Sequence, residues 1–277
     1  MSQHTSRATG FDSATLTRLE ADAAEIVARY PQARSALLPL LHLVQSEEGY
    51  VSPHGIEFCA DLLDLTAAEV AAVATFYTQY KRRPNGEYTV GVCTNTLCAI
   101  MGGDQIFATL KDHLGVGHDE TTDDGAITLE HLECNAACDY APVVMVNWEF
   151  FDNQTPESAT ALVDGLRSGD LPTPTRGASL CTFKQVSRVL AGFYDGRADE
   201  GPAAGPATLA GLEIYREQQE QEREGRHSTT RSGRSSGSAS EPQGYGRPES
   251  TSGSDAPAAT AKSDSANDST TEKDGDA

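Results

Sequence analysis

Two pairs of closely spaced cysteines constrain this chain more than any other feature of its sequence. Four residues separate Cys93 from Cys98, and three separate Cys134 from Cys138. Thirty-five residues lie between the two pairs. Each pair stands where a predicted strand runs into a loop, so one fold can bring all four thiols to the same place. No other part of the sequence carries comparable chemistry.

Four kinds of site could use these thiols. Structural zinc sites take four thiolates, but their pairs usually have the closer C-x2-C spacing. Dithiol redox sites of the thioredoxin kind also need C-x-x-C, which neither pair has. Two disulfides fit poorly with a reducing compartment. A [2Fe-2S] cluster takes four soft thiolates, and one pair per iron is a natural division. The spacing favours the cluster and leaves structural zinc as the alternative.

The residues around Cys98 suit an anionic centre. Helical spacing is predicted for residues 101–114, directly after this cysteine. The first N–H groups of a helix are free to donate, and they lie at its positive dipole end. Gly102 and Gly103 would let the backbone approach closely. We therefore expect N–H donors near the thiolates, which would favour the reduced, more negative cluster.

Composition separates a foldable part from a long tail. The 277 residues carry 41 acidic and 21 basic side chains, a net charge of −20. Residues 1–200 alone are near −15, and such an acidic surface argues against a nucleic-acid partner. Residues 201–277 are rich in Gly, Ser, Ala, Pro and charge, so this tail is predicted to be disordered.

The sequence shows no feature of an inserted or exported protein. It has no apolar run of 18 residues and no apolar segment in MSQHTSRATGFDSATL at the N-terminus. We therefore expect a cytoplasmic protein without direct membrane insertion. In that compartment its six cysteines are ligands or buried thiols rather than disulfides.

The first part of the chain is predicted to be a helical bundle, residues 11–82. Apolar side chains spaced by three and four residues indicate a first helix up to Pro31. A second is predicted over Ser35 to Glu48, interrupted by Pro39, and a third opens at Ser52-Pro53. Thr66 and Glu69 form a capping box for a fourth helix, which we expect to reach about Tyr80.

Residues 83–172 are predicted to form a small α/β layer of the thioredoxin type. A strand ends at Cys93, a helix follows over 101–114, and a second strand covers Ile127 to Leu132. A hairpin spans Pro142 to Phe151, and a last helix starts at Thr155-Pro156. The fold class is therefore α+β or α/β, a helical bundle followed by one sheet with helices.

Within residues 173–200, residues 178–193 form a further amphipathic run. Periodicity alone leaves two alternatives, a last core helix or a segment that packs against another subunit. We predict a docking segment here.

Three segments of the sequence resemble the two-iron, thioredoxin-like ferredoxin subunit of bacterial complex I, the NADH:quinone oxidoreductase. They are GVCTNTLCAIMGG (residues 91–103), ECNAACDYAPVVMVN (133–147) and ATFYTQY (74–80). The resemblance covers roughly residues 11–170. It implies a thioredoxin-like ferredoxin domain with one [2Fe-2S] cluster, held by four ligands: Cys93, Cys98, Cys134 and Cys138. The family often has Leu-Gly after the third of these cysteines, where this chain has Asn135-Ala136.

The resemblance also implies partners. The two-iron ferredoxin subunit docks on the subunit that binds FMN and oxidises NADH, and through it joins the other peripheral-arm subunits. This chain would then carry electrons on the cytoplasmic side of the membrane, with hydride chemistry done elsewhere. It has no G-x-G-x-x-G of its own. The alternatives are the equivalent subunit of an NAD-linked hydrogenase or formate dehydrogenase, and a zinc-stabilised interaction module without redox activity.

The remaining candidates are assigned structural roles. Cys59 and Cys181 are expected to be buried thiols, and His131 is expected to be a neighbour of the site rather than a ligand. Other side chains are expected to pack or to face solvent: Trp148, Tyr140, Asp139 and Glu133.

Overall fold

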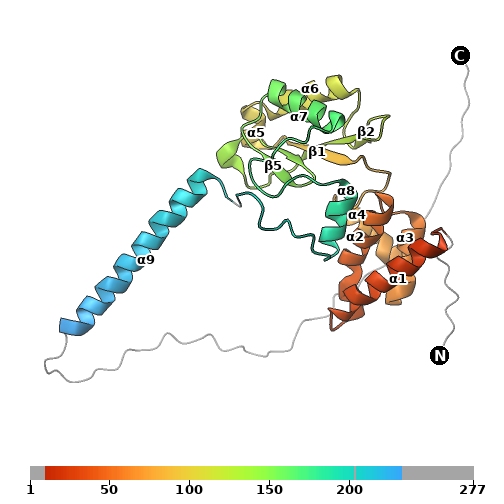
Figure 1. Cartoon of the computed structure of the whole chain (residues 1–277), viewed down its shortest axis with the longest axis horizontal. Coiled ribbons are helices and arrows are strands. Elements are labelled where there is room, and N and C mark those ends of the chain that lie inside the picture. Colours follow the sequence, from red (N-terminus) through yellow and green to blue (C-terminus); the bar gives the residue numbers. More distant parts are fainter. Residues whose placement is uncertain (1–9, 203, 233–277) are drawn as a thin grey trace, which may run out of the picture. The chain divides into compact units, whose positions relative to one another are not determined.

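The computed structural model describes residues 10–202 and 204–232 (Figure 1). The chain divides into two units, Met1–Gln221 and Glu222–Ala277. All elements described here belong to the first unit, except for the last turns of the final helix.

Four helices make up the N-terminal part. They are α1 (Ser13–Ala28), α2 (Leu37–Glu48), α3 (Pro53–Leu63) and α4 (Ala67–Phe76), with a short 3₁₀ turn, η1 (Ala33–Ala36), before α2. Side-chain caps at Asp12, Ser52 and Thr66 fix where α1, α3 and α4 begin. Pro39 lies in the first turn of α2, where no helical N–H is lost, so it does not interrupt the helix. The fourth helix ends at Phe76, not at Tyr80 as predicted.

These helices enclose one apolar core. Its completely buried side chains include Ala23, Ile26, Leu40, Leu41, Val44, Cys59 and Val70. Ala191, which lies far along the chain, completes the same core.

A five-stranded sheet follows, in the order β2-β3-β1-β4-β5. Its strands are β1 (Tyr88–Cys93), β2 (Glu120–Thr121), β3 (Ile127–Leu132), β4 (Val144–Val146) and β5 (Glu149–Phe151). β1 and β3 are parallel, and the other pairs are antiparallel. The predicted order of strands and helices is confirmed, with the short β2 added within the predicted loop.

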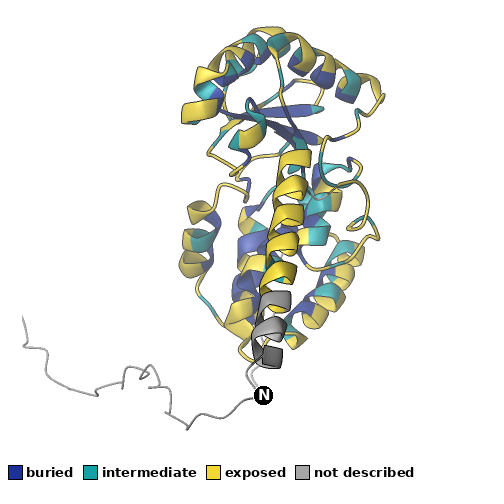
Figure 2. Ribbon diagram, turned by 90° about the vertical axis from the view of Figure 1, so that its left-hand side faces the viewer, coloured by how far each residue is buried: buried dark blue, intermediate teal, exposed yellow. Residues whose placement is uncertain are grey.

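The two faces of the sheet differ. One face carries Val90, Val92, Leu129 and Val144, and packs on α6 (Gly103–Leu114) and α7 (Pro156–Ser168). Successive side chains on a strand point to opposite faces, so Cys93 and Met145 lie on the other face, in a separate small cluster with Cys98. Figure 2 shows the strands as buried elements between helices.

The C-terminal part contains two more helices. In α8 (Phe183–Leu190), Phe183 and Ser187 are buried, and the helix packs on α2, so the amphipathic run supplies a core helix. α9 (Pro206–Ser232) is a correction to the predicted disorder of that stretch. The charged, Gln-rich sequence of α9 suits an exposed helix, and Figure 2 shows its first turns as mostly exposed. Residues 233–277 of the predicted tail lie outside the described residues. In the described residues, no helix has the length and apolar character to cross a membrane.

Candidate iron–sulfur site

The four paired cysteines come together in space. Cys93 ends β1, Cys98 lies in α5 (Thr96–Ile100), Cys134 follows β3, and Cys138 opens the 3₁₀ turn η2 (Cys138–Tyr140). All four line one small cavity, whose other lining residues are Asn135, Ala137 and Val143. The sheet register explains why, since β1 and β3 are parallel neighbours and Cys93 pairs with Leu132. Both cysteine loops therefore leave the same edge of the sheet.

Glycine at the start of α6 makes the tight packing of the first pair possible. A Cβ on Gly103 would lie 2.9 Å from the carbonyl oxygen of Cys98 and would also clash with that of Cys93. The preceding Gly102 has φ of 116°, which side chains strongly disfavour. The expected close backbone approach is confirmed at Gly103, whereas nothing lies within 4 Å of a Cβ added at Gly102.

The two pairs differ in burial. Cys93 and Cys98 are 3% and 2% exposed, whereas Cys134 is exposed and Cys138 half-buried. The sulfur atoms of Cys134 and Cys138 lie 3.5 Å apart. One side of the site is thus enclosed by protein and the other opens to the surface.

Backbone N–H groups donate to two of the sulfurs. The N–H of Ala136 donates to Cys134 Sγ at 3.4 Å, and that of Val143 donates to Cys98. Ala136 has φ of 55°, a conformation that favours glycine, at the position where the family often has one. The loop therefore keeps the glycine-like geometry although its residue is alanine.

Two of the four thiols, Cys98 and Cys138, have raised pKa values. Burial raises the pKa of Cys98 to about 11, and a hydrogen bond with Cys134 is the main cause of the raised pKa of Cys138. Metal ligation needs thiolates, so binding must release protons and be coupled to the local fold. Four soft donors with N–H groups aimed at sulfur fit an iron–sulfur cluster.

A contact between the two cysteine loops was not predicted. Asn95 Nδ2 donates to Glu133 Oε2 at 3.0 Å, which ties the loop after β1 to the loop after β3. Glu133 was expected only to face solvent. No local pattern pairs residues 38 positions apart, and adjacency to a cysteine was the sole signal available.

The other candidate residues lie outside the thiol cavity, and of the two thiols expected to be buried only Cys59 is so. Cys59 is completely buried, which raises its pKa to about 12, and Cys181 is half-buried against Arg197. His131 stacks on His118 with ring centroids 3.9 Å apart. Tyr140 lies under the Arg176 guanidinium. In the described residues, no three or more His, Cys, Asp or Glu side chains form a group that could hold a single metal ion.

The fold and the thiol site define an iron–sulfur electron carrier built on a thioredoxin-like domain. The profile of the thioredoxin-like [2Fe-2S] ferredoxin family matches residues 23–167, and this chain belongs to that family. The predicted fold class and the predicted [2Fe-2S] cofactor are thereby confirmed.

The particular relatives are components of a respiratory enzyme. The chain is 70% identical to an NADH-quinone oxidoreductase subunit of Mycobacterium tuberculosis over 202 residues, 73% of this chain and 80% of the relative. It is 38% identical to the corresponding subunit of Rickettsia bellii over 161 residues, 57% of this chain and 94% of the relative. The resemblance to the two-iron ferredoxin subunit of bacterial complex I is confirmed, and with it membership of a multi-subunit complex.

A likeness to a solved structure is weaker. An NAD+-reducing [NiFe]-hydrogenase gives a TM-score of 0.44 at 19% identity, covering 50% of this chain and 23% of the other. A score this low carries no argument for the hydrogenase alternative.

Proposed function

We propose that Cys93, Cys98, Cys134 and Cys138 together hold the one [2Fe-2S] cluster of this chain. The observation that carries the proposal is that all four thiols line one cavity, in two pairs from two neighbouring loops. A two-iron cluster takes two thiolates on each iron, so each loop can supply one iron. The family to which the chain belongs carries this cofactor.

When bound, such a cluster accepts and gives one electron at a time. The chain encloses it on the side of Cys93 and Cys98, and the N–H groups of Ala136 and Val143 favour negative charge on sulfur. Cys134 leaves the other side open. A redox partner can approach there while the sheet shields the opposite side from water.

The complex in which this carrier works is the NADH:quinone oxidoreductase. The names of its relatives support that assignment. We place the chain against the subunit that binds FMN and NADH, joined through it to the other peripheral-arm subunits. In this arrangement the chain lies on the cytoplasmic side of the membrane and transfers electrons without oxidising NADH itself.

Exposed apolar side chains beside the site suit a docked protein. Leu97, Ile100 and Met101, around Cys98 in α5, are 43%, 76% and 57% exposed. Large exposed apolar side chains grouped at one place mark interaction surfaces. The helical part offers Phe76 at 79% exposure. The predicted docking segment, residues 173–200, offers Leu190 and Tyr194, because the buried face of α8 already packs within this chain.

Ligand substitution combined with electron paramagnetic resonance tests the site. After dithionite reduction, the wild-type chain should show one [2Fe-2S] signal and two irons per chain. Cys134→Ser replaces a soft thiolate by a poorly acidic alcohol and should impair assembly. Cys59→Ala and Cys181→Ala are the matched controls and should keep the signal. Zinc alone in the purified protein contradicts the proposed cluster. A normal signal in Cys134→Ser contradicts the proposed ligand set.

Co-purification with the flavin-binding subunit tests the partner. NADH-dependent ferricyanide reduction should appear only when the flavin-binding subunit is present. Ile100→Glu should weaken the complex, whereas Leu171→Glu, at a 43% exposed position outside α5, should not. NADH oxidation by the isolated chain contradicts the assignment.

A further inference from the structure

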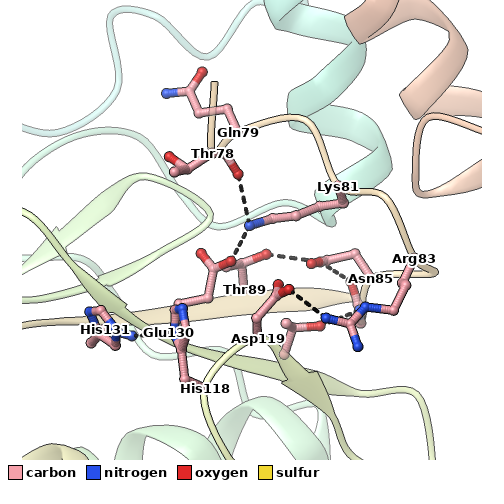
Figure 3. Close-up of polar contacts among 12 residues, drawn as sticks. Thr78, Gln79, Lys81, Arg83, Asn85, Thr89, His118, Asp119, Glu130 and His131 are labelled. Atoms are coloured by element: carbon pink, nitrogen blue, oxygen red, sulfur yellow. Dashed lines mark hydrogen bonds and ion pairs between the residues drawn. The ribbon is translucent and has the colours of Figure 1, made fainter. Parts of the chain in front are cut away.

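Lys81 and Glu130 form a buried ion pair on the cysteine-bearing face of the sheet. The Lys81 ammonium contacts the Glu130 carboxylate, and the two side chains are only 7% and 11% exposed. The ammonium also donates to the carbonyl oxygen of Thr78 at 3.2 Å. Figure 3 shows Lys81 placed between Thr78 and Glu130, joining the segment after α4 to the sheet.

The register of the strands places this ion pair close to the proposed cluster. Glu130 on β3 pairs with Gly91 on β1, and Cys93 follows two residues later on the same face. Two residues of strand span about 7 Å. A Cβ on Gly91 would lie against the Leu132 side chain, so Leu132 covers the gap that Gly91 leaves. Met145, opposite Gly91 on the other side of β1, packs with Cys93 and Cys98.

The medium between the ion pair and the cluster site is partly apolar. Leu132 and Met145 lie in it and pack with Cys93 and Cys98, beside an open cavity that Lys81, Glu130 and Cys134 also line. Charges interact more strongly through such a medium than through water. A charge at Lys81 or Glu130 can consequently act on the cluster.

The backbone at Lys81 is fixed by the helical core. The N–H of Lys81 donates to Gln45 Oε1 at 2.8 Å, and Gln45 Nε2 donates to the carbonyl oxygen of Gln79 at 3.1 Å. Gln45 itself is completely buried in α2. The ammonium is thus held in place opposite Glu130 and is not a mobile surface charge.

We propose that the Lys81–Glu130 pair sets the reduction potential of the cluster by keeping the net charge beside Cys93 at zero. The proposal rests on the function proposed above, with the cluster held by the four cysteines. Reduction adds one negative charge to the cluster. An uncompensated Lys81 would stabilise the reduced state, and an uncompensated Glu130 would destabilise it. Both residues are positioning residues here, because neither binds the metal.

Coulomb's law gives the size of the effect. One unit charge roughly 10 Å from the cluster, at an effective dielectric constant near 20, changes the ratio of reduced to oxidised cluster about tenfold. For a one-electron couple, a tenfold change corresponds to about 59 mV.

Redox titration at pH 7 of the holoprotein, followed by electron paramagnetic resonance, tests the proposal. Glu130→Gln should raise the potential by about 59 mV, and Lys81→Met should lower it. The double variant Lys81→Met/Glu130→Leu should return close to the wild-type value. Asp164→Asn is the charge control, because Asp164 lies on α7, over the opposite face of the sheet.

The direction of the shifts distinguishes an electrostatic role from a structural one. Loosening of the fold would move both single variants in the same direction, and that result overturns the proposal, as do unchanged potentials in both. If a single variant assembles no cluster, the double variant decides. A potential of the double variant that differs from the wild-type value by about 59 mV or more then overturns the proposal. These outcomes leave the ligand set untouched. Failure of the ligand set would appear instead as a normal signal in Cys134→Ser.

Discussion

The rings of Trp148 and Phe183 stack with their centroids 5.8 Å apart and their planes at 29°. Trp148 lies in the turn between β4 and β5, and Phe183 is the first residue of α8. Next to Trp148, Asn147 Nδ2 donates to the carbonyl oxygen of Cys181 at 2.7 Å. Because α8 packs on α2, these contacts join the sheet to the helical core.

Phe183→Ala should therefore destabilise the whole first unit. The side chain is 1% exposed, and removing a buried phenylalanine costs about 3 kcal/mol or more. Urea unfolding of the holoprotein, monitored by circular dichroism, measures the loss. Tyr194→Ala is the control, because Tyr194 is 72% exposed and should change the free energy of unfolding by less than about 0.5 kcal/mol. Equal effects of the two substitutions would refute this account of α8.

Gly103→Ala should impair cluster assembly. The added methyl group meets the backbone carbonyl oxygens of Cys93 and Cys98, and neither can move without displacing a proposed ligand. The expected loss of stability is about 2 kcal/mol, together with reduced iron content. Gly211→Ala in α9 is the matched control, because nothing lies within 4 Å of its added Cβ. It should keep full iron content, and so should Gly103→Ala if the close approach is unimportant.

Ala136→Gly should leave the cluster in place and make its loop slightly more stable. A residue with a side chain at φ of 55° is strained by about 1 kcal/mol, and the greater freedom of glycine in the unfolded chain offsets part of the gain. Ala136→Val should have the opposite effect, since β-branched residues tolerate positive φ poorly. The rate at which a chelator removes iron compares the three proteins. Faster loss from Ala136→Gly than from the wild type would contradict the prediction.

The helical core should lose stability in mild acid through His42. Burial lowers the pKa of His42 to about 4, from an ordinary value of 6.5. Above pH 6.5 the imidazole is neutral in both states, so its contribution is fully present there. Between pH 6.5 and 4 the unfolded chain takes up a proton that the folded chain does not, and stability falls by about 2 kcal/mol.

The variant His42→Leu should reduce this loss, as measured by urea unfolding at pH 7 and pH 4.5. The Nδ1 atom of His42 has no hydrogen-bond partner among the described residues. Replacing the imidazole by leucine therefore breaks no hydrogen bond at that atom. Phe183→Ala is the comparison, because it should be less stable than the wild type at both pH values while keeping the wild-type difference between them. An unchanged pH dependence in His42→Leu would show that other groups cause the loss.

Local features of the sequence were sufficient for most of the helices and strands and for the chemistry, although not for β2 or α9. The caps at Ser52 and Thr66 and the glycine at position 49 mark helix ends through contacts within a few residues, so they can be read without the fold. The spacing of the cysteine pairs indicated an iron–sulfur site, and the segments around them indicated its family.

Tertiary structure alone decided which distant residues meet. Lys81 and Glu130 are 49 positions apart, and Asn95 and Glu133 are 38 apart, so nothing in either local sequence specifies the partner. Periodicity gave α8 an apolar face, but only the packing of α8 on α2 and of Phe183 on Trp148 showed that this face is buried within the chain. The start of α9, rich in Ala and Gly, gave no sign of order, yet the N–H of Ala207 donates to the Tyr140 hydroxyl at 2.8 Å. Burial and pairing of this kind depend on how the sheet and helices are assembled in space, and that assembly is a property of the whole chain rather than of any one segment.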